Sequence, residues 1–387
     1  MAMTSRERVQ AVLHHEVPDQ VPVIIGVSNA TGIKMIPYQA VKKLAGITAP
    51  DEYIYDWPEL GTALPDEATM QRLHSDVRGV HDRFPQAVLN RNKNRPPHSN
   101  FVDDWGSGQS EIEEGVWYPG VHPLAEATTI EEVEAYTNWP DMDDPFRVAH
   151  VKAQARQLAA DNQYAIMATP WLLFPFERAH AMQGLDKFLY NMAVEKDFSK
   201  YLLEKIYGYC KILMGHFLDE LGENVDIIKI GDDLGTQESL LISPKMYREF
   251  LKPIHADFIS FIKSRTKAKV FFHTDGDVFN LIDDFIEIGV DILNPIQTSA
   301  GRMSNLAELK SRFGGRIVFC GAVDTQKVLP YGSPAEVRDE VKRVIHALGE
   351  GGDFMLASVH TIMNEVPAEN VLAMVDAAVE YGKYPPK

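Results

Sequence analysis

The stretch KVFFHTDGDV, residues 269–278, ends an apolar run in two side chains that can bind a metal ion, His273 and Asp275. A third candidate ligand, His360, follows another apolar run near the C-terminus. Two imidazoles and a carboxylate can hold Zn²⁺ with an open position, or Fe²⁺ and Mn²⁺ in a facial arrangement. A His-x-Asp pair alone more often marks a hydrogen-bonded histidine at a strand end. The presence of His360 as a third candidate favours the hypothesis that His273, Asp275 and His360 form a metal site.

Two further acids are candidates for proton transfer. Asp232 follows the run VDIIKIG, and Glu177 follows TPWLLFPFE. Asp232 is adjacent to Asp233, and neighbouring carboxylates in a loop either cap the next helix or bind a substrate. Glu177 also offers a fourth metal ligand. We predict Asp232 and Glu177 as the catalytic acids, with the capping alternative for Asp232 left open.

Polar and aromatic residues that follow other apolar runs are candidates for substrate contacts. Trp171 suits the wall of an apolar pocket, as do Phe174 and Phe176, and all three are equally compatible with the core. The residues predicted to bind substrate are Asn29, Trp171, Asp233, Asn294 and Gln297.

The places of these residues in the chain indicate one architecture. Short apolar runs alternate with longer stretches of helical period, which is typical of βα units and a parallel sheet. The runs are at 21–27, 75–80, 164–170, 225–233, 269–273, 290–295, 316–321 and 353–358. Eight strands close a (β/α)8 TIM barrel, in which active sites lie at the C-terminal ends of the strands. The candidate residues are therefore predicted to gather on one rim.

Two segments depart from this repetition. The chain begins with an N-terminal extension, and residues 82–145 follow the second run as an aromatic and glycine-rich insertion in which we expect a hairpin. Ser243 with Pro244 and Ser333 with Glu336 are typical helix starts, the second pair being a capping box. We predict a single domain over residues 1–387.

Composition excludes several classes of protein. The chain carries 55 acidic and 38 basic residues, a net charge of −17, which disfavours nucleic-acid binding. No apolar run approaches the roughly 18 to 20 residues of a membrane span, and the first residues do not form a signal peptide. Cys210 and Cys320 are too few for a disulfide framework. We expect a cytoplasmic protein with reduced, structural cysteines.

Several segments together resemble one known family. They are TSRERVQAVLHHEVPDQVPV, GDDLGTQESLLISPKMYREFLKP, HTDGDVFNLIDDFIEIGVDILNPIQ, GAVDTQKVLPYGSPAEVRDEV and ASVHTIMNEVPAENVLAMVDAAVEYG. In order and over nearly the whole chain, they resemble the uroporphyrinogen decarboxylase superfamily. That resemblance implies a (β/α)8 barrel.

The resemblance implies one of two activities. Uroporphyrinogen decarboxylases bind the many carboxylates of their substrate through an arginine-rich N-terminal segment and need no metal. The corresponding segment here, VIIGVSNATGIKMIPYQ, has no arginine, and with the acidic net charge this disfavours tetrapyrrole decarboxylation. Corrinoid-dependent methyltransferases, the other branch, hold zinc with a His-x-Cys pair after the fifth strand and a ligand after the eighth. His273 and His360 match that pattern, whereas Asp275 stands where cysteine is expected.

The change to Asp275 alters the expected chemistry. Without thiolate ligands the site is harder and more Lewis acidic, and it suits an oxygen better than a thiol. We therefore predict a corrinoid-dependent methyltransferase that moves a methyl group from an O-methyl substrate, a methoxylated aromatic, to Co(I) of a separate corrinoid protein. Zinc or another divalent metal would activate the leaving oxygen. A metal-dependent lyase or decarboxylase acting on a small organic acid, and a non-catalytic binding protein, stay open as alternatives. The sequence does not determine the oligomeric state.

Overall fold

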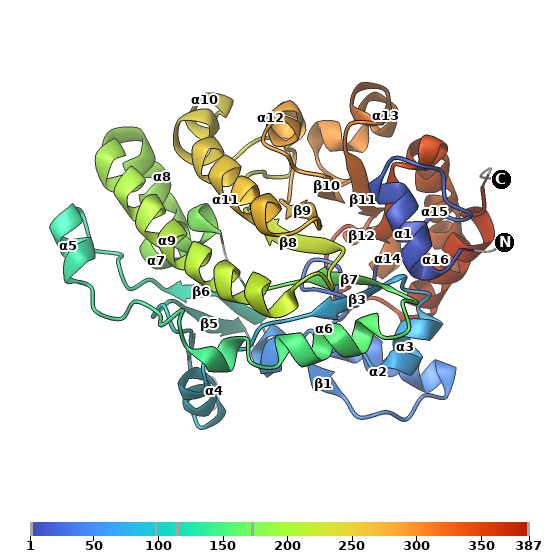
Figure 1. Cartoon of the computed structure of the whole chain (residues 1–387), viewed down its shortest axis with the longest axis horizontal. Coiled ribbons are helices and arrows are strands. Elements are labelled where there is room, and N and C mark those ends of the chain that lie inside the picture. The colour runs from blue at the N-terminus through green and yellow to red at the C-terminus, as the bar shows by residue number, and fades with distance from the viewer. Residues whose placement is uncertain (1–2, 97–98, 114–115, 172–173, 385–387) are drawn as a thin grey trace.

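The computed structural model describes residues 3–96, 99–113, 116–171 and 174–384. Its centre is a curled sheet of seven parallel strands in the order β12-β11-β10-β9-β8-β7-β3 (Figure 1). The strands are β3 (Val77–Val80), β7 (Ala165–Ala168), β8 (Ile227–Gly231), β9 (Lys269–His273), β10 (Ile292–Ile296), β11 (Val318–Val323) and β12 (Phe354–Ser358). Each strand overlaps one of the predicted apolar runs, and the TIM-barrel fold class is confirmed.

The first predicted run, 21–27, does not form a regular strand, although it occupies the eighth position of the ring. Its Val23 makes a parallel bridge to Leu356 of β12, and the Val23 carbonyl accepts a hydrogen bond of 2.8 Å from Asp76 N–H. Side chains replace backbone partners here: Val23 N–H donates to Asp76 Oδ2 and Ile25 N–H to Ser75 Oγ. The segment therefore lies between β12 and β3 without a continuous ladder.

Helices surround the sheet, as Figure 1 shows. Those that follow strands are α6 (Val151–Ala159), α7 (Pro175–Gln183), α8 (Leu185–Val194), α9 (Lys196–Leu221), α10 (Pro244–Met246), α11 (Lys252–Arg265), α12 (Ile282–Glu287), α13 (Leu306–Phe313), α14 (Val328–Tyr331), α15 (Pro334–Leu348) and α16 (Ala368–Tyr381). The N-terminal part adds α1 (Ser5–Leu13), α2 (Met35–Ala45) and α3 (Glu67–Arg72), with a short hairpin of β1 (Glu52–Tyr53) and β2 (Ala63–Leu64). Across the described ranges, no helix combines the length and apolar character needed to cross a membrane.

Side chains alternate between the two faces of each strand, and this alternation separates two cores. Ile227 and Phe271 point to the barrel interior, where Val9 and Val12 of α1 pack with them. Ile228 and other alternate residues point outward, into the layer between strands and helices. Because α1 fills the interior near the strand starts, the other end of the barrel is left for a site.

The two predicted helix starts are present, and one helix has an irregular turn. Ser333 and Glu336 form the predicted capping box at α15, and Ser243 Oγ accepts from Met246 N–H. Between α10 and α11 the chain turns as a π-helix, η4 (Tyr247–Leu251). Pro253 has no N–H to donate back along the helix, and such a gap in the usual ladder accompanies local π geometry.

The 82–145 segment contains the expected hairpin. Its strands β4 (Phe101–Val102), β5 (Gly108–Glu113) and β6 (Val116–Val121) form an antiparallel sheet, flanked by α4 (Gln86–Lys93) and α5 (Ile130–Ala135). Asp103, beside β4, forms an ion pair of 2.5 Å with Arg178 of α7. This contact fixes the insertion against the helix that follows β7.

Candidate metal centre

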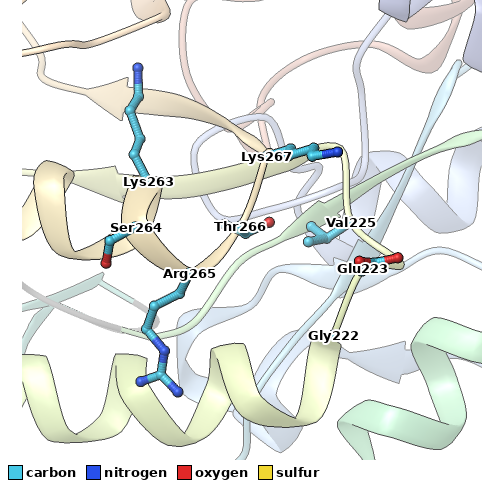
Figure 2. A pocket seen from close by; sticks show the side chains of 8 residues that line it. All are labelled: Gly222, Glu223, Val225, Lys263, Ser264, Arg265, Thr266 and Lys267. Carbon is cyan, nitrogen blue, oxygen red and sulfur yellow. The ribbon is translucent and has the colours of Figure 1, made fainter.

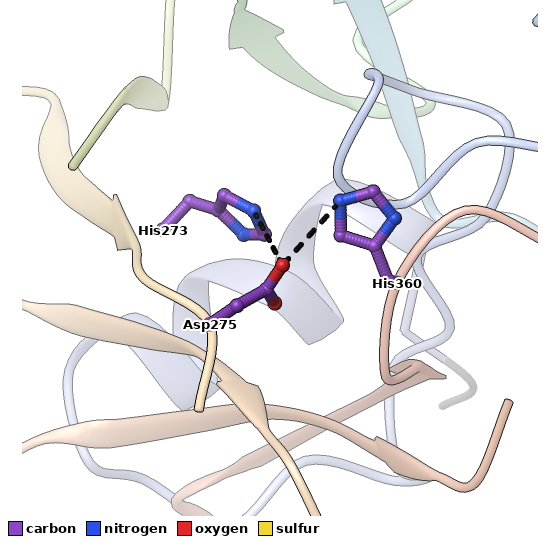
Figure 3. Close-up of side chains that lie close together, drawn as sticks. All are labelled: His273, Asp275 and His360. Atoms are coloured by element: carbon purple, nitrogen blue, oxygen red, sulfur yellow. Dashed lines mark ion pairs between the residues drawn. The ribbon is translucent and has the colours of Figure 1, made fainter. Parts of the chain in front are cut away.

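The three predicted metal ligands meet at the C-terminal ends of β9 and β12 (Figure 3). Asp275 Oδ2 lies 4.0 Å from His273 Nε2 and 3.8 Å from His360 Nε2. The three ligand atoms are all within 4.8 Å of one another. His273 ends β9 and is buried, whereas 40% of the His360 side chain is exposed. The prediction that these residues come together from distant parts of the chain is confirmed as geometry.

The His273 ring is held by a partner on the next strand. Its Nδ1 lies 2.7 Å from Asn294 Oδ1, and Asn294 Nδ2 donates to Cys320 Sγ at 3.7 Å. With Asn294 accepting, Nδ1 carries the proton and Nε2 keeps its lone pair facing Asp275. Imidazoles that bind metals are commonly oriented in this way by a second hydrogen bond. Burial lowers the pKa of His273, which favours the neutral form needed for binding.

Asp275 lies in a tightly held turn. Its N–H donates to Asp233 Oδ1 at 2.9 Å, and Gly276 N–H donates to Gln297 Oε1 at 2.7 Å. Gly276 has a φ of 88°, and a Cβ there would lie 2.3 Å from the Gly235 carbonyl carbon. Only glycine fits that conformation and that approach. The turn therefore fixes where the Asp275 carboxylate points.

His360 is placed by hydrogen bonds around the end of β12. The Ser358 hydroxyl donates to the His360 carbonyl at 2.6 Å, and the Thr361 hydroxyl donates to the Asn29 carbonyl. Burial lowers the pKa of His360. His360 therefore also favours its neutral, metal-binding form.

The donor set fits a divalent metal ion. Asp275 Oδ1 is buried without a hydrogen-bond partner among the described residues, so that carboxylate keeps free binding capacity. Burial raises the pKa of Asp275 to about 6, the nearby His273 opposes the rise, and a bound cation would favour the ionised form. The separations of 3.8 and 4.0 Å exceed the roughly 3.4 Å expected between ligands of a tetrahedral ion with bonds of about 2.1 Å. Binding would draw the side chains slightly together.

A cavity of about 80 Å³ lies beside the two histidines. Three of the five residues predicted to bind substrate face it: Asn29, Trp171 and Asp233. The other two do not face it. Asn294 Oδ1 forms a hydrogen bond with His273 Nδ1, and Gln297 Oε1 accepts a hydrogen bond from Gly276 N–H. The full lining is Asn29, Pro170, Trp171, Glu177, Lys229, Gly231, Asp233, His273 and His360.

Glu177 lies in the first turn of α7 and lines this cavity. Burial raises the pKa of its carboxyl well above the usual range, and the carboxylates of Asp233 and Asp232 raise it further. Lys229 partly opposes the rise. Glu177 therefore keeps its proton to a higher pH than an exposed glutamate does, and it lines the cavity beside the histidines.

Asp232, the other predicted acid, is turned away from the cavity. Its Oδ1 accepts from Glu177 N–H at 2.8 Å, and its Oδ2 accepts from Phe176 N–H at 3.2 Å. His255 Nε2 lies 3.1 Å from Oδ2, and both side chains are fully buried. Asp232 thus caps the start of α7, a helix that precedes it in the chain, and not the next helix that the sequence left open as an alternative. It is not among the described residues that line the cavity, and its role as a catalytic acid stays a prediction.

Lys229 is a cavity residue that the sequence analysis missed. It is buried on β8 between Ile228 and Ile230, which point outward, so its side chain points into the barrel. Burial lowers its pKa, while Glu177 and Asp233 raise it. One signal was present in the sequence: a single cation at an interior position of an otherwise apolar strand.

A second hollow, of about 440 Å³, lies at the opposite end of the barrel, before β8 and β9 (Figure 2). Two of its three basic side chains are already partnered, since Lys263 pairs with Asp291 and Arg265 with Asp219. Catalytic residues of such barrels come from the other ends of the strands. The lining is Gly222, Glu223, Val225, Lys263, Ser264, Arg265, Thr266 and Lys267.

Comparisons with known proteins agree with this architecture. A family model described as uroporphyrinogen decarboxylase (URO-D) matches residues 112–381. A uroporphyrinogen decarboxylase of Actinobacillus succinogenes is 35% identical over 79 residues, which is 20% of this chain and 22% of that protein. One of Psychromonas ingrahamii is 25% identical over 187 residues, 45% of this chain and 50% of that protein. The chain therefore matches between about a fifth and a half of the length of these relatives.

Similarity of fold extends further than similarity of sequence. A methyltransferase from Methanosarcina mazei has 19% sequence identity and a TM-score of 0.65, with 98% of this chain and 99% of that chain covered. At this identity the match concerns the fold alone.

Proposed function

Because the chain belongs to the uroporphyrinogen decarboxylase family, we propose that it is a methyltransferase of that superfamily that uses a metal. It transfers a methyl group from an O-methyl substrate, a methoxylated aromatic, to Co(I) of a separate corrinoid protein. The observation that carries the proposal is the convergence of two imidazole Nε2 atoms on one carboxylate oxygen at the active end of the barrel.

The ligand types support ether cleavage over the alternatives. His273, Asp275 and His360 would hold a divalent ion, zinc in the first instance, and such an ion supplies a Lewis acid beside the leaving oxygen. Oxygen and imidazole ligands without thiolate suit an oxygen leaving group. Decarboxylation of a polycarboxylate is disfavoured, since the carboxyl groups of Asp233 and Asp275 lie in or beside a small cavity.

Glu177 would complete the reaction by supplying a proton. As the bond between the methyl carbon and oxygen breaks, the methyl carbon bonds to cobalt and the oxygen leaves with the electron pair. The proton of the Glu177 carboxyl, whose pKa is raised by burial and nearby carboxylates, then passes to that oxygen. Lys229 balances the negative charge of the surrounding carboxylates.

An assay of methylcobalamin formation tests the proposal. The protein is mixed with cob(I)alamin and a panel of methoxylated benzenes, and the visible absorbance of methylcobalamin is followed. We expect turnover with at least one aryl methyl ether. No turnover with any ether, together with release of CO₂ from a small organic acid, would favour the lyase alternative.

Metal analysis tests the site separately from turnover. His273→Ala and His360→Ala should each lose most of the bound metal after dialysis, as measured by elemental analysis. His14→Ala, on the exposed end of α1, is the matched control and should retain it. Equal metal content in all three variants would contradict the proposed ligand set.

A further inference from the structure

A second cavity adjoins the metal centre, between the inserted hairpin and α7. Its volume is about 210 Å³, and aromatic rings of Trp57, Phe101 and Trp171 line it. Trp171 and Glu177 line this cavity and also the small cavity at the histidines. A ligand in the larger cavity therefore has one end beside Glu177, close to the metal ligands.

The size of this cavity limits what it can hold. An apolar cavity of about 150 Å³ accommodates a benzene ring. At about 210 Å³, this one has room for a single substituted ring. A tetrapyrrole, with four such rings and their carboxylate side chains, exceeds that room several-fold.

The charge of the lining indicates an uncharged ligand. Arg178 is the cation among the described lining residues; its Nη1 pairs with Asp103 at 2.5 Å, whereas its Nε has no partner there. Burial lowers the pKa of His180 to about 4, so that ring is neutral at pH 7. A carboxylate on the ligand would have to share Arg178 with Asp103, and burying this second negative charge beside one cation is costly.

Three buried polar atoms on the described lining residues lack partners. Trp57 Nε1, Ser107 Oγ and Arg178 Nε have no hydrogen-bond partner in the part of the chain that the structure describes, and each residue is 4% exposed or less. Buried donors of this kind are normally satisfied. An oxygen substituent on a bound ring is a chemically suitable acceptor for them.

We propose that this cavity binds the aryl ring of the methyl donor and selects uncharged single-ring methyl ethers. The inference rests on the proposed function for the identity of the reacting group. It adds the place where the rest of the donor binds, and it makes the contact between the insertion and α7 a determinant of specificity.

Direct binding to the wild-type protein tests the charge selection. Isothermal titration with 1,2-dimethoxybenzene and with 3,4-dimethoxybenzoate compares the same ring with and without a carboxylate. We expect the neutral ether to bind at least tenfold more tightly. Equal or tighter binding of the benzoate would overturn the proposal.

A cavity-filling variant tests the location. Ala181 of α7 lines the cavity, and Ala181→Leu adds three carbons there while keeping a strong helix former. Leu89→Phe is the control, because Leu89 lines a separate hollow of about 330 Å³ that also has Trp57 and Phe101 in its wall. We expect Ala181→Leu to weaken binding of 1,2-dimethoxybenzene at least tenfold and to leave the metal content unchanged.

The outcomes separate this inference from the proposed reaction. Loss of ether binding in Ala181→Leu but not in Leu89→Phe supports the subsite even if no methylcobalamin forms. Unchanged binding in a folded Ala181→Leu protein, or loss only in Leu89→Phe, would overturn it. If Ala181→Leu does not fold, the wild-type comparison of ether and benzoate still decides the charge selection.

Discussion

Replacing Asp232 by alanine should destabilise the protein strongly, because this carboxylate holds the start of α7. The change removes acceptors from Glu177 N–H, Phe176 N–H and His255 Nε2, at 2.8, 3.2 and 3.1 Å. A buried donor left without an acceptor costs about 1–3 kcal/mol. Two backbone donors therefore give about 2–6 kcal/mol, and relief of the buried carboxylate offsets part of this. We expect a loss of about 3 kcal/mol.

Urea denaturation of Asp232→Ala, followed by circular dichroism, measures this loss as a lower midpoint at an unchanged m-value. Thr129→Ala is the matched control: Thr129 caps the exposed helix α5, and its removal should cost only about 1 kcal/mol. A loss of less than about 1 kcal/mol in Asp232→Ala, combined with abolished methyl transfer, would refute the reasoning. Asp232 would then be a catalytic acid, as the sequence suggested.

Three further changes give measurable outcomes. Asn294→Leu removes the acceptor that orients His273, and equilibrium dialysis should show metal affinity lowered by about 10- to 100-fold; unchanged affinity would contradict the orienting role. Asp275→Cys should raise the preference for Zn²⁺ over Mn²⁺ by about tenfold in competition dialysis, because thiolate is the softer ligand; an unchanged preference would show that residue 275 does not bind the metal. Burial raises the pKa of Asp82 from 3.8 to about 7, so the folded protein binds more protons than the unfolded chain between these values. Stability contributed by this group should fall by about 4 kcal/mol as pH rises from 4 to 7 and then level off. Asp82→Asn should remove that slope in denaturation curves recorded across the window, and a slope unchanged in the variant would contradict the assignment.

Local patterns in the sequence were enough for much of the fold. Seven of the predicted runs became strands of one parallel sheet, because apolar runs of that length between helical stretches have few other ways to be buried. The Ser333 and Glu336 capping box also depends only on neighbours in the chain. The run at 21–27 failed as a regular strand because side chains of Asp76 and Ser75, distant in sequence, took over its hydrogen bonds.

The types of the candidate metal ligands were likewise visible in the sequence, whereas the roles of the residues around them were not. His273 and Asp275 are recognisable as candidate ligands because an imidazole and a carboxylate, which can both bind a metal, stand at the end of an apolar run. The tertiary structure alone placed Asp232 under α7, turned Asn294 toward His273 and pointed Lys229 into the cavity. These outcomes depend on which elements pack beside each strand end when the ring closes. The neighbours of a residue in the chain do not determine which side chains it meets in the fold. Only the folded arrangement therefore decides whether a residue caps a helix, orients another side chain or takes part in the reaction.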